Sequence, residues 1–141
     1  MKISPADKYF SLCIRERNNW TCEYSGKYFP EGSRQGLHCS HYVGRANYST
    51  RFDPRNAFSH SYHSHAKLGG DPIEFNIWVV DYKGGSLIDY LITQKRDISL
   101  GKAIKKSIKQ VGFYYKEQYE AMLELRKDGH IGYLEFDGFE P

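Results

Sequence analysis

The sequence predicts a single α+β domain in which two short strands and a helix are flanked by further helices. Its 141 residues suit one domain, with 40% hydrophobic and 26% charged residues, as in ordinary globular proteins. Apolar residues recur at helical spacing near the N-terminus and throughout the C-terminal half, and a strand-like segment lies between them. We expect four parts: an N-terminal helix (1–19), a strand–strand–helix core (20–70), a helical region (71–127) and a tail (128–141).

The N-terminal part begins as a helix should. Ser4 is suited to cap the helix, and Pro5 to occupy its first turn. The helix should end near Asn18 and Asn19. Its apolar residues follow one face: Tyr9, Phe10, Cys13 and Ile14.

The core part contains the predicted strands. Residues 21–36 are rich in turn-forming residues and predict a loop or short hairpin. We expect one strand over 37–45, with a turn at Gly44, and a second over 49–53. A helix over 53–70 should then end at a pair of glycines.

The C-terminal half is predicted to be helical. Residues 71–85 indicate a buried helix, although their dense apolar pattern also fits a strand, and 86–97 indicate a short helix. One long helix is expected over 99–129, capped by Ser99. Its apolar stripe comprises Ile104, Ile108, Val111, Tyr115, Tyr119 and Met122. The tail holds three glycines and four acids, and we expect it to be loosely ordered.

Composition narrows the class of protein. No apolar run is long enough to span a membrane, and the N-terminus lacks a signal-peptide pattern, so we expect a cytoplasmic protein without a membrane partner. The three cysteines, Cys13, Cys22 and Cys39, cannot all pair with one another, which argues against a disulfide framework. A net charge of +3 permits a nucleic-acid partner without requiring one.

The stretch from His38 to Gly70 holds five of the six histidines, together with arginines. Hydrolysis of a phosphodiester needs a base that deprotonates water and a cation beside the leaving 3′-oxygen. A strand can hold the base, and a helix packed across the strand can bring ligands to one metal ion. His41, Asn56 and His65 are spaced for this arrangement.

This region resembles the HNH, or ββα-metal, nucleases, and more narrowly the phage NinG (Rap) recombination endonucleases. That family has two cysteine pairs, a Gly-His-aromatic strand followed by Arg, and an Arg-Phe-Asp/Asn-x-x-Asn stretch. The order of motifs agrees from about Phe10 to Leu125. Four segments carry the likeness: "RERNNWTCEYSG", "CSHYVGR", "TRFDPRN" and "LGGDPIEFNIWV".

The resemblance implies a metal-dependent DNA endonuclease with a small ββα-metal element. His41 would take a proton from the attacking water. Asn56 and His65 would help hold one Mg²⁺ or Mn²⁺ ion, unless Asn56 instead orients the His41 loop. Arg45 and Arg51 would face the scissile or a neighbouring phosphate, which a guanidinium grips in a forked geometry.

One metal ligand is left open. In HNH nucleases an acid or histidine often precedes the base, but here that position is Ser40. A third ligand would have to be His38, Asp53 or His60.

The structural zinc of the family is predicted to be absent. Cys22 would pair with position 25, which is serine, and the second cysteine pair would fall at Ser61 and Ser64. A neutral hydroxyl is a poor zinc ligand beside a thiolate, so aromatic packing or serine hydrogen bonds should hold the loop. The alternative is a zinc site rebuilt from Cys22, Cys39, His60 and His63.

The expected partner is DNA, and the likeness suggests branched or recombination-intermediate DNA in a phage context, hence the host cytoplasm. Double-strand cleavage by a single HNH site would need a homodimer or two visits. Alternatives are sequence-specific nicking, a non-catalytic DNA-binding module on a decayed scaffold, and a structural zinc protein. Four lysines at helical spacing form either a phosphate-tracking ridge or a solvated face: Lys102, Lys105, Lys106 and Lys109.

Overall fold

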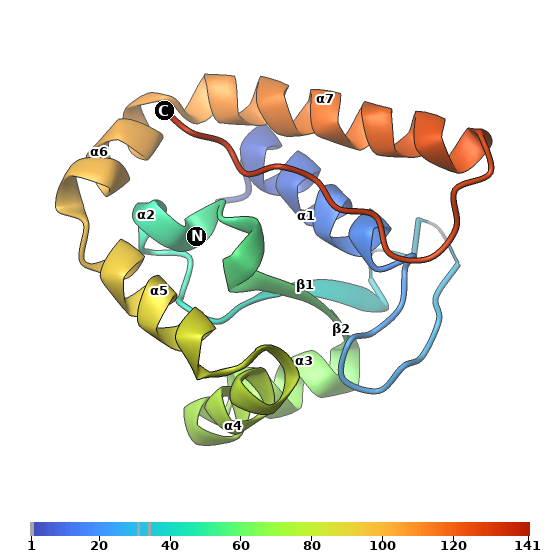
Figure 1. The fold of residues 1–141 in the computed structure, drawn as a ribbon, viewed down its shortest axis with the longest axis horizontal. Coiled ribbons are helices and arrows are strands. Elements are labelled where there is room, and N and C mark those ends of the chain that lie inside the picture. Colours follow the sequence, from blue (N-terminus) through green and yellow to red (C-terminus); the bar gives the residue numbers. More distant parts are fainter. Residues whose placement is uncertain (1, 31, 34) are drawn as a thin grey trace.

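A computed structural model describes residues 2–30, 32, 33 and 35–141 (Figure 1). Helices surround a small antiparallel sheet, which confirms the predicted α+β class. The elements in chain order are α1 (Pro5–Arg17), β1 (Leu37–His41), α2 (Tyr48–Arg51), the 3₁₀ helix η1 (Pro54–Asn56), β2 (Ala57–Ser61), α3 (Tyr62–Gly69), α4 (Pro72–Lys83), α5 (Gly85–Lys95), α6 (Ile98–Lys106) and α7 (Ile108–Lys127).

A strand–strand–helix unit is present, but its second strand is not where the sequence predicted it. β1 pairs antiparallel with β2, from Leu37 opposite Ser61 to His41 opposite Ala57, and α3 follows β2 directly. The predicted strand over 49–53 is wrong, because most of this segment forms α2. All five residues of β2 are buried, so the strand lacks the alternation of polar and apolar residues that marks a half-exposed strand.

The loop before β1 agrees with the prediction in the part that the structure describes. Thr21 and Tyr28 form an isolated antiparallel bridge, as in a short hairpin. Positions 31 and 34 of the predicted loop lie outside the described residues.

The main core forms where α1 packs along α7 (Figure 1). Both helices turn their apolar faces inward, which confirms the predicted α1 and the predicted apolar stripe. Ser4 caps α1 as expected, and the Asp7 side chain completes a reciprocal capping box. The fully or nearly fully buried residues of this core include Phe10, Cys13, Ile14, Ile104, Val111, Tyr115 and Met122.

The single long helix predicted for 99–129 is two helices. α6 ends at Lys106 and α7 begins at Ile108, with Ser107 between them in a non-helical conformation. Asp97, rather than Ser99, caps α6, because its side chain accepts a hydrogen bond from Leu100 N–H. The break allows α6 to pack on α2 while α7 packs on α1.

The tail is ordered against the main core, and the expectation of a loose tail is wrong. It runs extended beside α1, as the red segment in Figure 1 shows, and Leu134 N–H donates to the Arg17 carbonyl (3.0 Å). Leu134, Phe136 and Phe139 pack against the core. Counting acids and glycines missed these apolar residues, which anchor the segment by burial.

The predicted helices over 71–85 and 86–97 are confirmed as α4 and α5, but α4 is mostly exposed and not the buried helix that its apolar pattern indicated. Phe75 and Val79 of α4 form a second core with Phe58 of β2 and Leu68 of α3. In the part of the chain that the structure describes, every helix is too short or too polar to cross a bilayer.

Candidate active site

The alternation of side chains along β1 divides the predicted site into two groups. The His41 ring lies toward α1, with its centroid 5.9 Å from that of Phe10. Ser40 points to the opposite face, where its Oγ lies 2.6 Å from Nδ1 of His65. Among the described residues, no hydrogen bond or ring contact joins His41 to His65.

His41 is held in one tautomer. Its Nε2 lies 2.9 Å from the carbonyl oxygen of Arg51. A carbonyl can only accept, so Nε2 carries the proton and Nδ1 keeps its lone pair. Burial, with a smaller contribution from the Arg45 charge, lowers the pKa of His41 to about 4, so the ring is neutral at neutral pH. A neutral, oriented imidazole with a free lone pair is what proton abstraction from water requires.

The two predicted phosphate-binding arginines have different environments. Arg51 is buried, and its guanidinium donates to both carboxylate oxygens of Asp7 at 3.0 and 2.8 Å. The prediction that Arg51 faces a phosphate is therefore wrong, because an internal carboxylate occupies that position. Arg45 lies farther from Asp7, at 3.5 Å, and 31% of its side chain is exposed, so it remains accessible to an anion.

Asp7 supplies the negative charge beside Arg45 and Arg51. Burial alone would raise the pKa of Asp7, but hydrogen bonds from Arg51 and Ser4 outweigh it and hold the pKa below its ordinary value. The carboxylate therefore stays charged and fixes the residue whose carbonyl orients His41.

Asn56 braces the loop between the strands. Its Oδ1 accepts from Val43 N–H (2.7 Å), and its Nδ2 donates to the carbonyls of Val43 (2.9 Å) and Thr50 (3.1 Å). The side chain is fully buried, and these backbone groups use its amide. These contacts agree with the alternative, that Asn56 orients the His41 loop, and give no support to Asn56 as a metal ligand.

The second group gathers two of the predicted metal ligands. The rings of His38 and His65 stack at 5.0 Å between centroids, with only 6° between their planes. His38 Nε2–H donates to the Gln35 carbonyl, and Ser40 lies against the other ring. Burial, followed by the charge of His38, lowers the pKa of His65, which keeps its ring neutral and able to bind a metal ion.

Of the candidates for the third ligand, the structure favours His38. Asp53 lies in a different cluster, where it accepts from Arg55 and from the Tyr90 hydroxyl. His60 is paired with His38 across the strands, but aromatic rings enclose it and both of its ring nitrogens are buried without a partner. Burial, followed by the charge of His65, lowers the pKa of His60 to about 3.

The histidine donor set fits the expected ion only in part. The described residues contain no group of three His, Cys, Asp or Glu side chains arranged to hold a metal ion. Two imidazoles and a hydroxyl could supply part of a coordination shell, with water or a substrate phosphate completing it. Imidazole ligands suit transition ions better than Mg²⁺, which prefers oxygen ligands. Mn²⁺ therefore fits this group better than Mg²⁺.

The four positions expected for two cysteine pairs lie together in space. Cys22 Sγ lies 3.5 Å from Ser64 Oγ and accepts from Ser25 N–H (3.4 Å), while Ser61 Oγ donates to Ser64 Oγ (2.9 Å). Burial alone would raise the pKa of Cys22, but these hydrogen bonds lower it to about 7. The hydrogen bond from Cys22 Sγ to Ser64 Oγ thus joins the loop to α3.

The alternative zinc site is not assembled. Cys39 packs with the main core on the α1 side of the hairpin, whereas Cys22 contacts Ser64 at the start of α3. His60 is enclosed by Phe58, Phe75 and Trp78. These side chains do not converge on one point.

No family model, curated protein or solved structure matches this chain.

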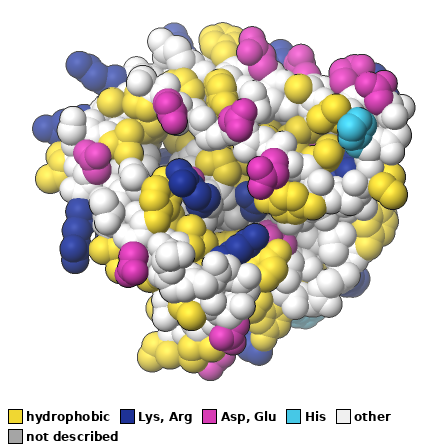
Figure 2. All heavy atoms as spheres, viewed as in Figure 1, with side chains coloured by type: hydrophobic (Ala, Val, Ile, Leu, Met, Phe, Trp, Pro, Cys, Tyr) yellow, Lys and Arg dark blue, Asp and Glu magenta, His cyan; other side chains and the backbone are white. Residues whose placement is uncertain are grey.

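The predicted lysine ridge borders the His41 group. Lys102, Lys105, Lys106 and Lys109 are all exposed, and Figure 2 shows Lys and Arg side chains along the left edge, where α6 lies. Lys105 Nζ lies 5.6 Å from the ring centre of Tyr48, a residue of α2 that also contacts Arg51. Lys105 of α6 therefore lies beside α2, the helix whose Arg51 carbonyl orients His41.

Sequence reasoning missed Asp7 altogether. The Ser4-x-x-Asp7 pattern was visible as a capping box. Its second role, binding an arginine 44 residues away, is a tertiary contact that leaves no local pattern.

Proposed function

We propose that this protein is a metal-dependent endonuclease that hydrolyses phosphodiester bonds in DNA, with His41 as the general base. The hydrogen bond from His41 Nε2–H to the Arg51 carbonyl carries the proposal, because it leaves Nδ1 as the proton acceptor. The likeness to HNH nucleases supports it, since the same strand position supplies the base in that family.

In the proposed mechanism, the scissile phosphate lies at the end of β1, between the two histidine groups. Arg45 binds the phosphate. His41 takes a proton from water through Nδ1, and the water oxygen attacks phosphorus in line as the bond to the 3′-oxygen breaks. The leaving 3′-oxygen takes a proton from solvent water, which gives 5′-phosphate and 3′-hydroxyl ends. The bound phosphate would also raise the pKa of His41 from about 4, which strengthens the base when substrate is present.

His38, His65 and Ser40 would hold the divalent ion. When bound, the ion would stabilise negative charge that develops on the leaving 3′-oxygen. His38 and His65 stack with nearly parallel rings, so their in-plane lone pairs do not converge, and at least one ring would have to turn for both to bind the ion.

The lysines of α6 and the start of α7 would give the protein salt-dependent affinity for DNA without reading its sequence. Branched or recombination-intermediate DNA, a phage context, action in the host cytoplasm and a homodimer remain proposals that rest on the family likeness.

A plasmid-nicking assay tests the function. Purified protein would be mixed with supercoiled DNA and Mn²⁺ or Mg²⁺, beside His41→Ala and a matched control, His63→Ala. His63 is an exposed histidine on the same strand–strand–helix unit. Nicking by the parent and the control, but not by His41→Ala, supports the endonuclease. Equal nicking by His41→Ala would exclude His41 as the base.

A second candidate is a non-catalytic DNA-binding module. The opposite orientations of His41 and His65, and the neutralisation of Arg51 by Asp7, favour it. Salt-dependent DNA binding without nicking in any divalent ion would select this alternative.

A further inference from the structure

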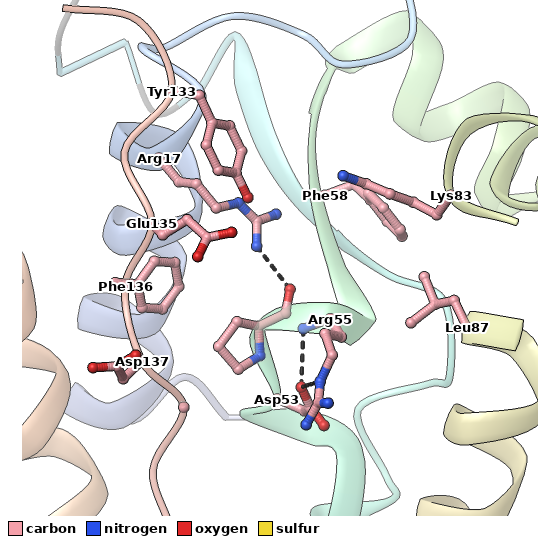
Figure 3. Close-up of a pocket in the computed structure, with 12 residues that line it drawn as sticks. Arg17, Asp53, Arg55, Phe58, Lys83, Leu87, Tyr133, Glu135, Phe136 and Asp137 are labelled. Carbon is pink, nitrogen blue, oxygen red and sulfur yellow. Dashed lines mark hydrogen bonds and ion pairs between the residues drawn. The ribbon is translucent and has the colours of Figure 1, made fainter.

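A cleft of about 510 Å³ opens between the C-terminal tail and the α4–α5 turn, over β2 and η1 (Figure 3). Its volume lies in the range of small-molecule sites. None of the residues that line it belongs to the two histidine groups. Figure 2 shows basic side chains set into a hollow near the centre of this face, with acidic side chains around it.

The cleft carries both signs of charge in equal number. Arg17, Arg55 and Lys83 line it together with Asp53, Glu135 and Asp137. In Figure 3 Lys83 points in from one wall, while Arg17 and Glu135 point in from the other. The described residues offer no ion-pair partner to either Lys83 or Glu135. A ligand with both donors and acceptors would satisfy these groups, whereas a simple anion or cation would not.

Aromatic rings complete the cleft. Tyr133 is 51% exposed, and its ring covers the Arg17 guanidinium at 6.0 Å, with Phe136 on the same guanidinium at 5.8 Å. An exposed ring beside cations can stack a nucleobase while the cations bind its phosphate. The polar side chains of the cleft can then form hydrogen bonds with the edge of the base.

We infer that this cleft binds one unpaired nucleotide of the DNA substrate. Tyr133 stacks on the base, Lys83 binds the flanking phosphate, and Glu135 accepts from the base edge. The inference rests on the proposed action on DNA and specifies one feature of the substrate, an extrahelical nucleotide.

The cleft and the proposed base belong to one structural unit. Residues 53–55 form part of the floor of the cleft, and the next residue, Asn56, braces the His41 loop. Ala57 follows and is the strand partner of His41. A nucleotide anchored in the cleft would therefore fix the register of the strand that approaches His41.

Binding of labelled DNA without divalent ions tests this inference separately from catalysis. Fluorescence anisotropy would compare a duplex carrying one unpaired nucleotide with the fully paired duplex. Stacking of one base predicts about tenfold tighter binding of the first. Tyr133→Ala should remove this preference, and Lys83→Ala should weaken binding of the duplex with the unpaired nucleotide more than binding of the paired duplex. The control is Lys95→Ala, which removes an exposed lysine from α5 outside the cleft.

A second readout locates the contact. Photo-crosslinking with 5-iodouracil at the unpaired position should label the peptide that contains Tyr133. Equal affinity for the two duplexes, a preference that survives both variants, or a crosslink elsewhere would overturn the inference. A protein that nicks DNA but shows no preference loses only this inference. A protein that prefers the unpaired nucleotide but never nicks loses the endonuclease and keeps the cleft.

Discussion

The two faces of the β1–β2 hairpin each bury a histidine, and the two histidines differ in their partners. His41 donates through Nε2 to a backbone carbonyl and lies near Arg45, while His60 has two unpartnered ring nitrogens among aromatic rings. Burial lowers both pKa values, to about 4 and about 3. The comparison teaches that a shifted pKa does not identify a base, whereas a hydrogen bond that fixes the tautomer indicates one.

The largest expected effect is on the nicking rate, which should depend on His41 and not on His60. His41→Ala should lower the nicking rate about 100- to 10,000-fold, because a general base contributes rate enhancement of that order. His60→Phe should keep nicking near the parental rate, since an aromatic ring replaces an aromatic ring in an apolar site. Single-turnover nicking rates measure both. Comparable losses in the two variants would break the comparison.

The second largest effect is a loss of stability when the Asp7 carboxylate is removed. Asp7→Asn leaves the Arg51 guanidinium buried without its counter-charge, and we expect the free energy of unfolding to fall by about 3–5 kcal/mol. Urea denaturation at neutral pH measures the change. Asp89→Asn, at a position in α5 with no ion pair among the described residues, is the control and should change little. An unaltered stability in Asp7→Asn would contradict the ion pair.

Both buried histidines should make the protein sensitive to acid. The unfolded chain takes up protons at the ordinary histidine pKa of 6.5, whereas the folded chain does so only near pH 4 and pH 3. Stability is therefore full above pH 6.5 and falls as the pH drops below it. At pH 5 each histidine accounts for a loss of about 2 kcal/mol. Urea denaturation at pH 7 and pH 5 tests this, and His60→Phe should lose about half of the dependence.

The smallest effect concerns Cys22. Because a serine hydroxyl can replace the Cys22 thiol in its hydrogen bond to Ser64, Cys22→Ser should lower the free energy of unfolding by only about 1 kcal/mol. Elemental analysis of the parent protein should find less than one zinc per chain. A stoichiometric zinc ion, with unfolding of the variant, would show that a metal site holds the loop.

Local patterns predicted the parts of the fold that local interactions determine. Capping residues and helical spacing were sufficient for α1, α4 and α5 and for the stripe that α7 buries. β2 could not be recognised because both of its faces are buried, and the break at Ser107 depends on packing of α6 against α2. The candidate site shows the same difference between features set by local sequence and features set by tertiary contacts. The position of His41 on a strand was predictable, whereas the inward turn of Arg51 depends on a distant carboxylate.

The packing of the tail has a consequence for how the chain folds. The ring of Phe10 contacts both His41 (5.9 Å) and Phe136 (6.4 Å), so residues more than 120 positions apart in the sequence share one cluster. Contacts of such high sequence separation slow folding, because a long loop must close before they form. During synthesis the proposed base would therefore acquire its final surroundings only after almost the whole domain has been translated.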